Sequence, residues 1–175
     1  MLTFLVGGAR SGKSTLAVEL GVRHDGPVVF IATAEAFDDD LRERIVRHRA
    51  ERPDWPTVEV PVELADAVRH APGDALVIVD CLTVWMANLF HHMPDLVARE
   101  IACSDLVAAL TDRSGPIVVV SNEVGLGLHP DTPLGREYRD ELGRLNQRVA
   151  AIAGRSLLLV AGRALPLTDP LEVLS

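Results

Sequence analysis

Short apolar runs recur along the chain, separated by longer stretches of mixed polarity. The runs are rich in β-branched residues, do not alternate with polar positions, and cover residues 2–6, 28–32, 75–79, 116–120 and 157–161. Runs of this kind are typical of strands that are covered on both faces, as in a parallel sheet. Each run therefore predicts a buried strand.

The stretches between these runs have the composition and spacing of helices. The predicted helices cover residues 13–23, 38–52, 62–70, 96–110 and 136–153. The last has one apolar face, formed at three- and four-residue steps by Leu142, Leu145, Val149 and Ile152. Alternation of strand and helix predicts an α/β fold, a mostly parallel sheet with helices on both faces and right-handed crossovers.

Length and composition narrow the classes of function. A length of 175 residues suits one domain. Neither internal repeats nor a shift in composition indicates a domain boundary within residues 1–175. A net charge of −8 with 4% aromatic residues argues against non-specific nucleic-acid binding and against a platform of stacked rings. No apolar stretch approaches the roughly 20 residues that cross a bilayer, and the apolar start lacks the basic flank of a secretory signal. We expect no membrane span and a cytoplasmic location, with Cys81 and Cys103 as buried thiols.

The strongest motif directly follows the first predicted strand. Residues 7–14 match the phosphate-binding pattern G-x-x-x-x-G-K-[ST] throughout, with Gly7, Gly8, Ala9, Arg10, Ser11, Gly12, Lys13 and Ser14. Glycines let successive backbone N–H groups converge on phosphate oxygens, and the following helix N-terminus adds partial positive charge. We expect Lys13 to reach the β- and γ-phosphates and the Ser14 hydroxyl to bind Mg²⁺. The motif predicts a nucleoside triphosphate site.

A partner carboxylate is expected at the end of another buried strand. Asp80 follows the run 75–79 and fits this Walker-B position, where it would organise Mg²⁺ through its water shell. The alternative is an aspartate that caps the following segment.

Positive charge is concentrated in residues 38–52 of this acidic chain. Arginines at 42, 44, 47, 49 and 52 surround His48. One interpretation is a solvated helix with ion pairs four residues apart. The other is a site where arginines bind phosphates and a neutral His48 imidazole attacks one of them. The charge pattern leaves both open.

Five blocks in order along the chain resemble the bifunctional adenosylcobinamide kinase/adenosylcobinamide-phosphate guanylyltransferase family. They are GGARSGKS at 7–14, IAT at 31–33, RIVRHRAERP at 44–53, SNEVGLGLHP at 121–130 and RLNQR at 144–148. The first block is common to many nucleotide-binding proteins, whereas H-R-x-x-R-P and N-E-V-G-x-G are far more specific. Without the resemblance, the loop 122–130 reads equally as a structural turn or as a ligand contact.

The resemblance implies a recombinase-like P-loop fold and two reactions in cobalamin assembly. ATP or GTP phosphorylates the adenosylcobinamide hydroxyl, and GTP then transfers GMP to adenosylcobinamide phosphate through a guanylylated histidine, which maps onto His48. Nucleotide contacts carry over to residues 7–14 and to Thr33, Ala34, Glu35, Arg49, Ala50, Glu51, Arg52, Glu59 and Asp80. Some members have Glu at position 80, and Arg47 stands where some have a second histidine. A homotrimer with the corrinoid between subunits is also implied.

Two other functions remain compatible with the phosphate-binding motif. A plain small-molecule kinase would leave His48 without a role. A nucleotide-dependent switch would need a guanine-reading N-K-x-D motif and a D-x-x-G glycine after Asp80, and the sequence contains neither. We expect His91 and His92 to lie in a loop without binding zinc, and Trp55, Trp85 and Met86 to serve packing.

Overall fold

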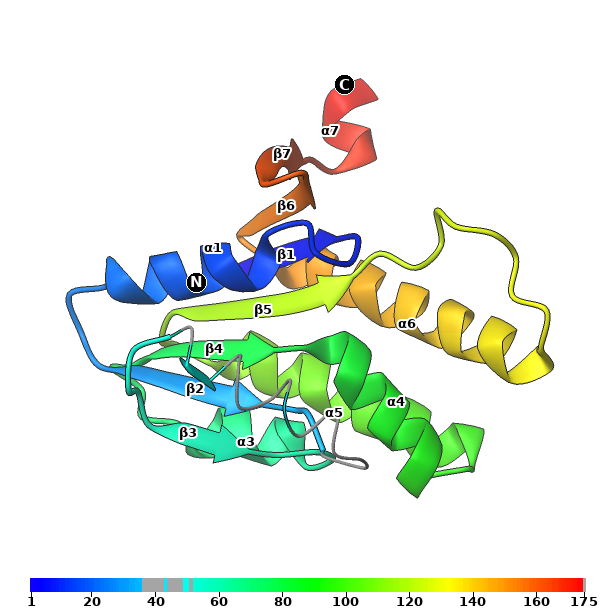
Figure 1. The fold of residues 1–175 in the computed structure, drawn as a ribbon, viewed down its shortest axis with the longest axis horizontal. Coiled ribbons are helices and arrows are strands. Elements are labelled where there is room, and N and C mark those ends of the chain that lie inside the picture. The colour runs from blue at the N-terminus through cyan, green and yellow to red at the C-terminus, as the bar shows by residue number, and fades with distance from the viewer. Residues whose placement is uncertain (36–42, 44–48, 51, 175) are drawn as a thin grey trace.

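A seven-stranded sheet forms the centre of the molecule. The computed structural model describes residues 1–35, 43, 49–50 and 52–174. Its strands are β1 (Leu2–Gly7), β2 (Val28–Ala32), β3 (Thr57–Glu59), β4 (Leu76–Asp80), β5 (Ile117–Asn122), β6 (Arg155–Val160) and β7 (Arg163–Leu167). They lie in the order β3-β2-β4-β5-β1-β6-β7 (Figure 1). All neighbours are parallel except β6 and β7, which confirms the predicted mostly parallel α/β sheet.

Helices cover both faces of this sheet, as predicted. The helices that cover the sheet are α1 (Lys13–Val22), α3 (Leu64–His70), α4 (Leu82–His92), α5 (Leu96–Asp112) and α6 (Pro133–Ile152). A further helix, α7 (Pro170–Leu174), has no buried residue. Helix α1 packs on one face, whereas α3 to α6 cover the other (Figure 1). None of the helices in the described residues is long and apolar enough to cross a membrane.

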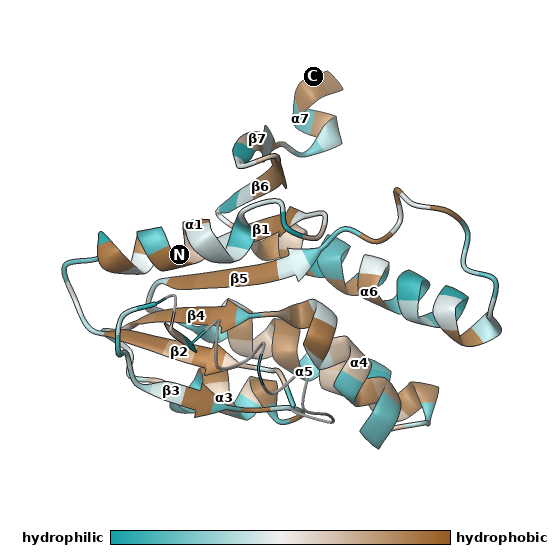
Figure 2. Ribbon diagram, viewed as in Figure 1, coloured by the Kyte–Doolittle hydropathy of each residue, from teal (hydrophilic) through white to brown (hydrophobic). Residues whose placement is uncertain are grey.

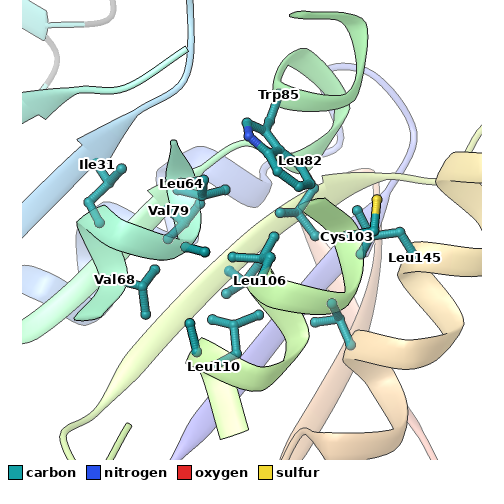
Figure 3. Packing of buried hydrophobic residues seen from close by; sticks show 14 of the residues in the cluster. Ile31, Leu64, Val68, Val79, Leu82, Trp85, Cys103, Leu106, Leu110 and Leu145 are labelled. Carbon is teal, nitrogen blue, oxygen red and sulfur yellow. The ribbon is translucent and has the colours of Figure 1, made fainter. Parts of the chain in front are cut away.

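Two apolar cores result, because successive strand residues point to opposite faces. Leu5 and Phe30 contribute to the core beneath α1. Their neighbours Phe4 and Ile31 contribute to the larger core beneath the other helices. There Leu82, Trp85, Leu106 and Leu145 meet strand side chains (Figure 3). Brown, hydrophobic colour dominates β2 and β4 and most of β5 in Figure 2, in agreement with burial on both sides.

The structure extends the set of elements predicted from the sequence. The five apolar runs correspond to β1, β2, β4, β5 and β6. Strands β3 and β7 were not predicted, because β3 has three residues and every residue of β7 is exposed. Helix α4 was also missed, and the prediction of a loop at His91 and His92 is wrong because both lie in its last turn. Most of the predicted helix 38–52 lies outside the described residues.

Most residues expected to pack do so. Leu142, Leu145 and Val149 form the buried face of α6. Trp85 and Met86 are buried, and Trp55 packs against the core beneath α1 rather than standing free.

Both cysteines are free thiols within the protein. Burial raises the pKa of the Cys103 thiol to about 12 and that of the Cys81 thiol to about 11. Part of the Cys81 residue is nevertheless exposed. Both thiols are therefore protonated near neutral pH and are poor nucleophiles.

The parallel arrangement brings the predicted site residues to one edge of the sheet. The motif 7–14 begins at the end of β1, Asp80 ends β4 and Glu59 ends β3. Strand β5 lies between β1 and β4. Ligands of α/β proteins bind at this carboxyl edge, so the fold supports the predicted position of the nucleotide site.

Candidate nucleotide site

The phosphate-binding loop depends on glycine at two of its positions. A Cβ atom on Gly7 would lie 2.3 Å from the Leu159 carbonyl oxygen, so only glycine permits this contact with β6. Gly12 has a φ of 100°, a left-handed conformation that favours glycine, and it directly precedes α1. Arg10 also has a positive φ of 55°. The loop therefore curls back over the start of α1, as the motif predicts.

The turn between β6 and β7 packs against this loop. Ala161 and Gly162 both have positive φ values, 52° and 71°, which form the tight hairpin. The Gly162 amide donates a hydrogen bond to the Ser11 carbonyl at 2.9 Å, and Gly162 lies close to Gly12. A turn about 150 residues downstream thus supports the phosphate-binding loop, a contact that the local sequence did not reveal.

The Lys13 side chain is buried within the loop. Its ammonium donates to the Gly8 carbonyl at 2.7 Å and lies 3.4 Å from the Ser11 hydroxyl. Burial lowers the pKa of Lys13, and the nearby Cys81 and Asp80 oppose this shift. The structure therefore places Lys13 near Asp80.

Ser14 and Asp80 supply the oxygen ligands that Mg²⁺ prefers. Ser14 is the second residue of α1, and Asp80 is a partly exposed residue at the end of β4. A hydroxyl and a carboxylate suit a hard divalent cation that also keeps water and phosphate ligands. Within the described residues, no group of three or more His, Cys, Asp or Glu side chains could hold a metal. A role of Ser14 and Asp80 in binding Mg²⁺ stays a prediction.

Arg52 lies over the middle of β2 and contacts the first residue of β3. Its guanidinium carbon lies 3.6 Å from the centre of the Phe30 ring, and it donates to the Thr57 hydroxyl at 2.9 Å. Burial and the charge of Arg49 lower the pKa of Arg52, whereas Asp80 and Glu59 raise it. Both acidic side chains therefore lie near the guanidinium.

Together with Lys13, Arg52 places positive charge among the acidic groups near the ends of β3 and β4. Lys13 lies near Asp80, Asp80 near Arg52, and Arg52 near Glu59. This is how an acidic protein offers local positive charge to a phosphate chain.

Thr33 holds the end of β4 rather than pointing into solvent. The residue is fully buried, and its hydroxyl exchanges two hydrogen bonds with the backbone of Cys81. Its amide donates to the Asp80 carbonyl at 3.3 Å. Its expected contact with nucleotide stays a prediction, while its structural effect is to position Asp80.

The Glu35 carboxylate is paired with His92 at the far end of α4. The Glu35 Oε2 atom lies 2.8 Å from His92 Nε2. Since α4 has eleven residues, this pair lies about 16 Å along the helix from its start beside Asp80. The structure does not bring the Glu35 carboxylate together with Lys13. Contacts of Glu35 and Ala34 with nucleotide stay predictions.

The arginine-rich block is only partly described. His48 and Glu51 lie outside the described residues, and so does Arg47. Arg49 and Ala50 are helical and exposed. The roles of these residues, and the choice between a solvated helix and a phosphate site, stay predictions.

Two of the sequence blocks meet beside the phosphate-binding loop. Asn146, from block 144–148, donates to the Asn122 carbonyl at 3.0 Å and accepts from the Ser121 hydroxyl at 2.7 Å. The Asn122 amide donates to the Thr83 hydroxyl at 2.7 Å. Asn146 and Thr83 therefore fix the end of β5 between the phosphate-binding loop and Asp80.

The loop that follows β5 combines a fixed start with exposed apolar side chains. The Glu123 amide donates to the Gly7 carbonyl at 3.1 Å, which ties the loop to the phosphate-binding motif. Farther along, Leu126 and Leu128 are almost fully exposed. The start of this loop thus has a structural role, whereas its contact with a ligand stays a prediction.

A separate cavity lies at the opposite edge of the sheet. It has a volume of about 870 Å³ and is lined by residues at the end of α1 and before β2 and β4, including Gly21, Pro27, Trp55 and Ala75. The cavity is therefore distinct from the phosphate-binding loop.

Comparison with known proteins identifies the family. Residues 3–167 match the sequence profile described as "Cobinamide kinase / cobinamide phosphate guanyltransferase". The chain belongs to this family. A relative from Pseudomonas aeruginosa, named bifunctional adenosylcobalamin biosynthesis protein CobP, is 41% identical over 95% of this chain and 97% of its own length. The Escherichia coli relative, bifunctional adenosylcobalamin biosynthesis protein CobU, is 36% identical over 93% of this chain and 97% of its own.

A solved structure agrees on the fold. The similarity is to an ATPase from the type III secretion system of pathogenic bacteria, with a TM-score of 0.54 and 17% identity. The match covers 91% of this chain and 51% of that one. The predicted P-loop fold is confirmed, and the family resemblance drawn from the sequence blocks is confirmed by the profile match.

Proposed function

We propose that this chain performs both reactions in its family's description. It phosphorylates adenosylcobinamide and then transfers GMP from GTP to adenosylcobinamide phosphate, giving adenosylcobinamide-GDP. The main support is the phosphate-binding loop with Lys13 buried beside Asp80, in a chain that matches this family over residues 3–167. Relatives named as bifunctional in adenosylcobalamin biosynthesis agree with a dual activity.

The kinase step uses the loop and its lysine. Backbone N–H groups of residues 8–14 hold the β- and γ-phosphates of ATP or GTP, and Lys13 balances the negative charge that develops on the transferred group. The substrate hydroxyl oxygen forms a bond to the γ-phosphorus, the bond to the β-phosphate oxygen breaks, and the hydroxyl proton passes to solvent. Mg²⁺ held with Ser14 and Asp80 would supply further neutralisation of phosphate charge.

The guanylyl step uses His48. Its neutral imidazole attacks the α-phosphorus of GTP, so that an N–P bond forms and pyrophosphate leaves. A phosphate oxygen of adenosylcobinamide phosphate then attacks the same phosphorus, which releases His48 and completes the product. Arg52, whose guanidinium lies over Phe30 and donates to Thr57, supports this step, because a guanidinium can bind phosphate oxygens in two places. Arg49, beside His48 in the sequence, has the same chemistry.

A single-turnover experiment separates this function from its rivals. The protein is mixed with GTP labelled at the α- or γ-phosphate, with and without adenosylcobinamide. The proposal expects γ-label in phosphorylated substrate, and α-label first on protein and then in the final product. Transfer of γ-label with no protein adduct would instead identify a plain kinase. Binding and slow hydrolysis with no transfer would identify a nucleotide switch.

We also propose that the chain forms a homotrimer with the corrinoid bound between subunits, as the family resemblance implies. Support for an interface comes from the C-terminal hairpin and α7, where large apolar side chains are exposed, namely Leu165, Leu167, Leu171, Val173 and Leu174. Exposed apolar groups of this number mark interaction surfaces. Sedimentation at micromolar concentration should give three times the monomer mass, and a monomer would contradict the proposal. The double variant Leu171→Glu/Leu174→Glu should weaken association if α7 takes part.

A further inference from the structure

One face of α4 contacts the chain on both sides of the arginine-rich block. We define the entry limb as residues 33–35, directly after β2, and the exit limb as residues 60–62, directly after β3. The contacting residues on or next to α4 are Cys81, Trp85, Asn88 and His92. Their spacing of four, three and four residues is that of a single helix face. The helix therefore forms a common support for the two limbs.

Asn88 contacts both limbs with one side-chain amide. It is 2% exposed, and its Nδ2 atom donates to the Thr33 carbonyl at 2.7 Å and to the Pro61 carbonyl at 3.0 Å. An asparagine amide has two N–H donors, so both donors are used to join the limbs.

Other contacts on the same face involve one limb each. Trp85 Nε1 donates to the Val62 carbonyl at 2.7 Å, and His92 pairs with Glu35 at 2.8 Å. The buried double contact of Asn88 is therefore well placed to fix the distance between the limbs.

The chain between the limbs holds the groups that the guanylyl step needs. In sequence it includes His48 and Arg49, and in the structure Arg52 lies over Phe30 near Asp80. Both ends of this stretch are fixed to a helix that begins two residues after Asp80. The separation of the limbs therefore sets the distance between the two ends of this stretch.

The kinase groups are held mainly by other contacts. The loop is supported by the Gly162 amide at Ser11, and the end of β5 by Asn146. The end of β4 is held by the Thr33 hydroxyl at Cys81. None of these bonds includes the Asn88 side chain, which contacts the Thr33 carbonyl and not the Thr33 hydroxyl that holds Cys81.

We propose that Asn88 is a positioning residue for guanylyl transfer, because it joins the two limbs between which the chain carries His48 and Arg49. This inference rests on the proposed function, because it concerns the guanylyl half of that function. It gives Asn88 little direct part in γ-phosphoryl transfer.

The test compares two rates in one variant. Asn88→Leu keeps a similar volume and removes both donors. We expect the single-turnover rate of protein guanylylation at saturating GTP to fall at least about tenfold, while the kinase kcat stays within about threefold. A small displacement of reacting groups slows the step in which those groups take part, and the variant displaces the groups of guanylyl transfer. Equal losses in both rates, or no loss in guanylylation, would overturn the proposal.

Arg113→Leu is the matched control. Arg113 also donates to backbone carbonyls of neighbouring segments, including those of Ala71, Pro72 and Ala75, but it lies at the opposite edge of the sheet. Its loss should lower stability and leave the ratio of the two rates unchanged. A change in that ratio as large as in Asn88→Leu would show a general effect of destabilisation and overturn the proposal.

Two further measurements complete the test. If Asn88→Leu does not fold, Asn88→Ser retains a small donor, and its guanylylation should be selectively slower by at least about threefold. A Ser variant with an unchanged ratio of rates would overturn the positioning role. A wild-type protein that forms no covalent GMP adduct would overturn the guanylyl-histidine step itself and this inference with it. If the wild type forms the adduct and the Asn88 variants form it equally fast, only this inference is overturned.

Discussion

The Thr33 hydroxyl closes a pair of hydrogen bonds on the backbone of Cys81, accepting from its amide at 2.9 Å and donating to its carbonyl at 2.8 Å. Thr33 follows β2 and Cys81 follows the neighbouring strand β4. The pair therefore fixes the point where the chain leaves the sheet, directly beyond Asp80.

Thr33→Val should lower both stability and kinase activity. Valine has the same shape but leaves the buried amide and carbonyl of Cys81 without this partner, at a cost of about 1–3 kcal/mol. Urea denaturation measures the loss, and a kinase assay measures the effect of a displaced Asp80. Thr33→Ser keeps the hydroxyl and should retain most of both. Wild-type stability in Thr33→Val would contradict the role of this pair.

Lys13→Met should abolish phosphoryl transfer without unfolding the protein. Removal of the charge that faces the γ-phosphate should slow the reaction by about 100-fold or more. Methionine keeps the apolar stem of the lysine and has no charge to bury. The measurement is kinase kcat beside circular dichroism. Retention of more than a tenth of the activity would contradict the role of Lys13.

The same variant gives a prediction about pH. Because burial lowers the pKa of Lys13, the unfolded chain binds more protons than the folded one between this lowered pKa and 10.5. Within this pH window, the contribution of Lys13 to the free energy of unfolding of the wild-type protein should therefore increase as pH rises. Any stability advantage of Lys13→Met at neutral pH should shrink toward pH 10.5, as followed by urea denaturation. An advantage that grows with pH would contradict this sign.

Asp80→Asn should reduce the kinase rate more than it reduces nucleotide binding. The amide keeps the size of the side chain but loses the charge that suits Mg²⁺, so we expect a loss of about 100-fold in kcat. Asp80→Glu keeps the charge and should recover part of the rate at raised Mg²⁺. The readout is kcat as a function of Mg²⁺ concentration. Equal kinetics in Asp80→Asn and wild type would contradict a metal role.

Arg99→Met should strongly destabilise the fold. Arg99 is 2% exposed and forms two hydrogen bonds with the buried Glu141 carboxylate, at 2.9 and 2.8 Å, which link α5 to α6. Its removal leaves a buried charge without a partner and should cost about 3–5 kcal/mol. The double variant Arg99→Met/Glu141→Leu should be more stable than Arg99→Met. Thermal or urea denaturation that ranks the double variant lower would contradict this account.

Local patterns allowed the central part of the fold to be predicted from sequence. Each buried strand is a run of apolar residues, and the phosphate-binding loop is specified within residues 7–14. Strand β7 has no buried residue and so lacks an apolar pattern of its own. Helix α4 was not among the predicted helices, although its buried residues Leu82, Trp85, Met86 and Leu89 follow the spacing of a helix face.

The site was predicted where it depends on neighbours in sequence and missed where it depends on distant ones. The positions of Lys13 and Asp80 at one sheet edge follow from the motif and from strand order. The contact of Gly162 with Ser11 joins residues far apart in the chain, and so do the contacts of Asn88. Such residues have no local signature, since their hydrogen bonds exist only once the sheet and α4 have formed.

The central claim, that His48 takes up a guanylyl group, is tested most directly by mass spectrometry of the intact protein. The protein is incubated with GTP and Mg²⁺ in the absence of a corrinoid acceptor. We predict a mass increase of one GMP, lost in acid and stable in base, which peptide mapping places on His48. His48→Ala should gain no GMP and keep its kinase activity. An unmodified wild-type protein, or equal labelling of His48→Ala, would contradict the account.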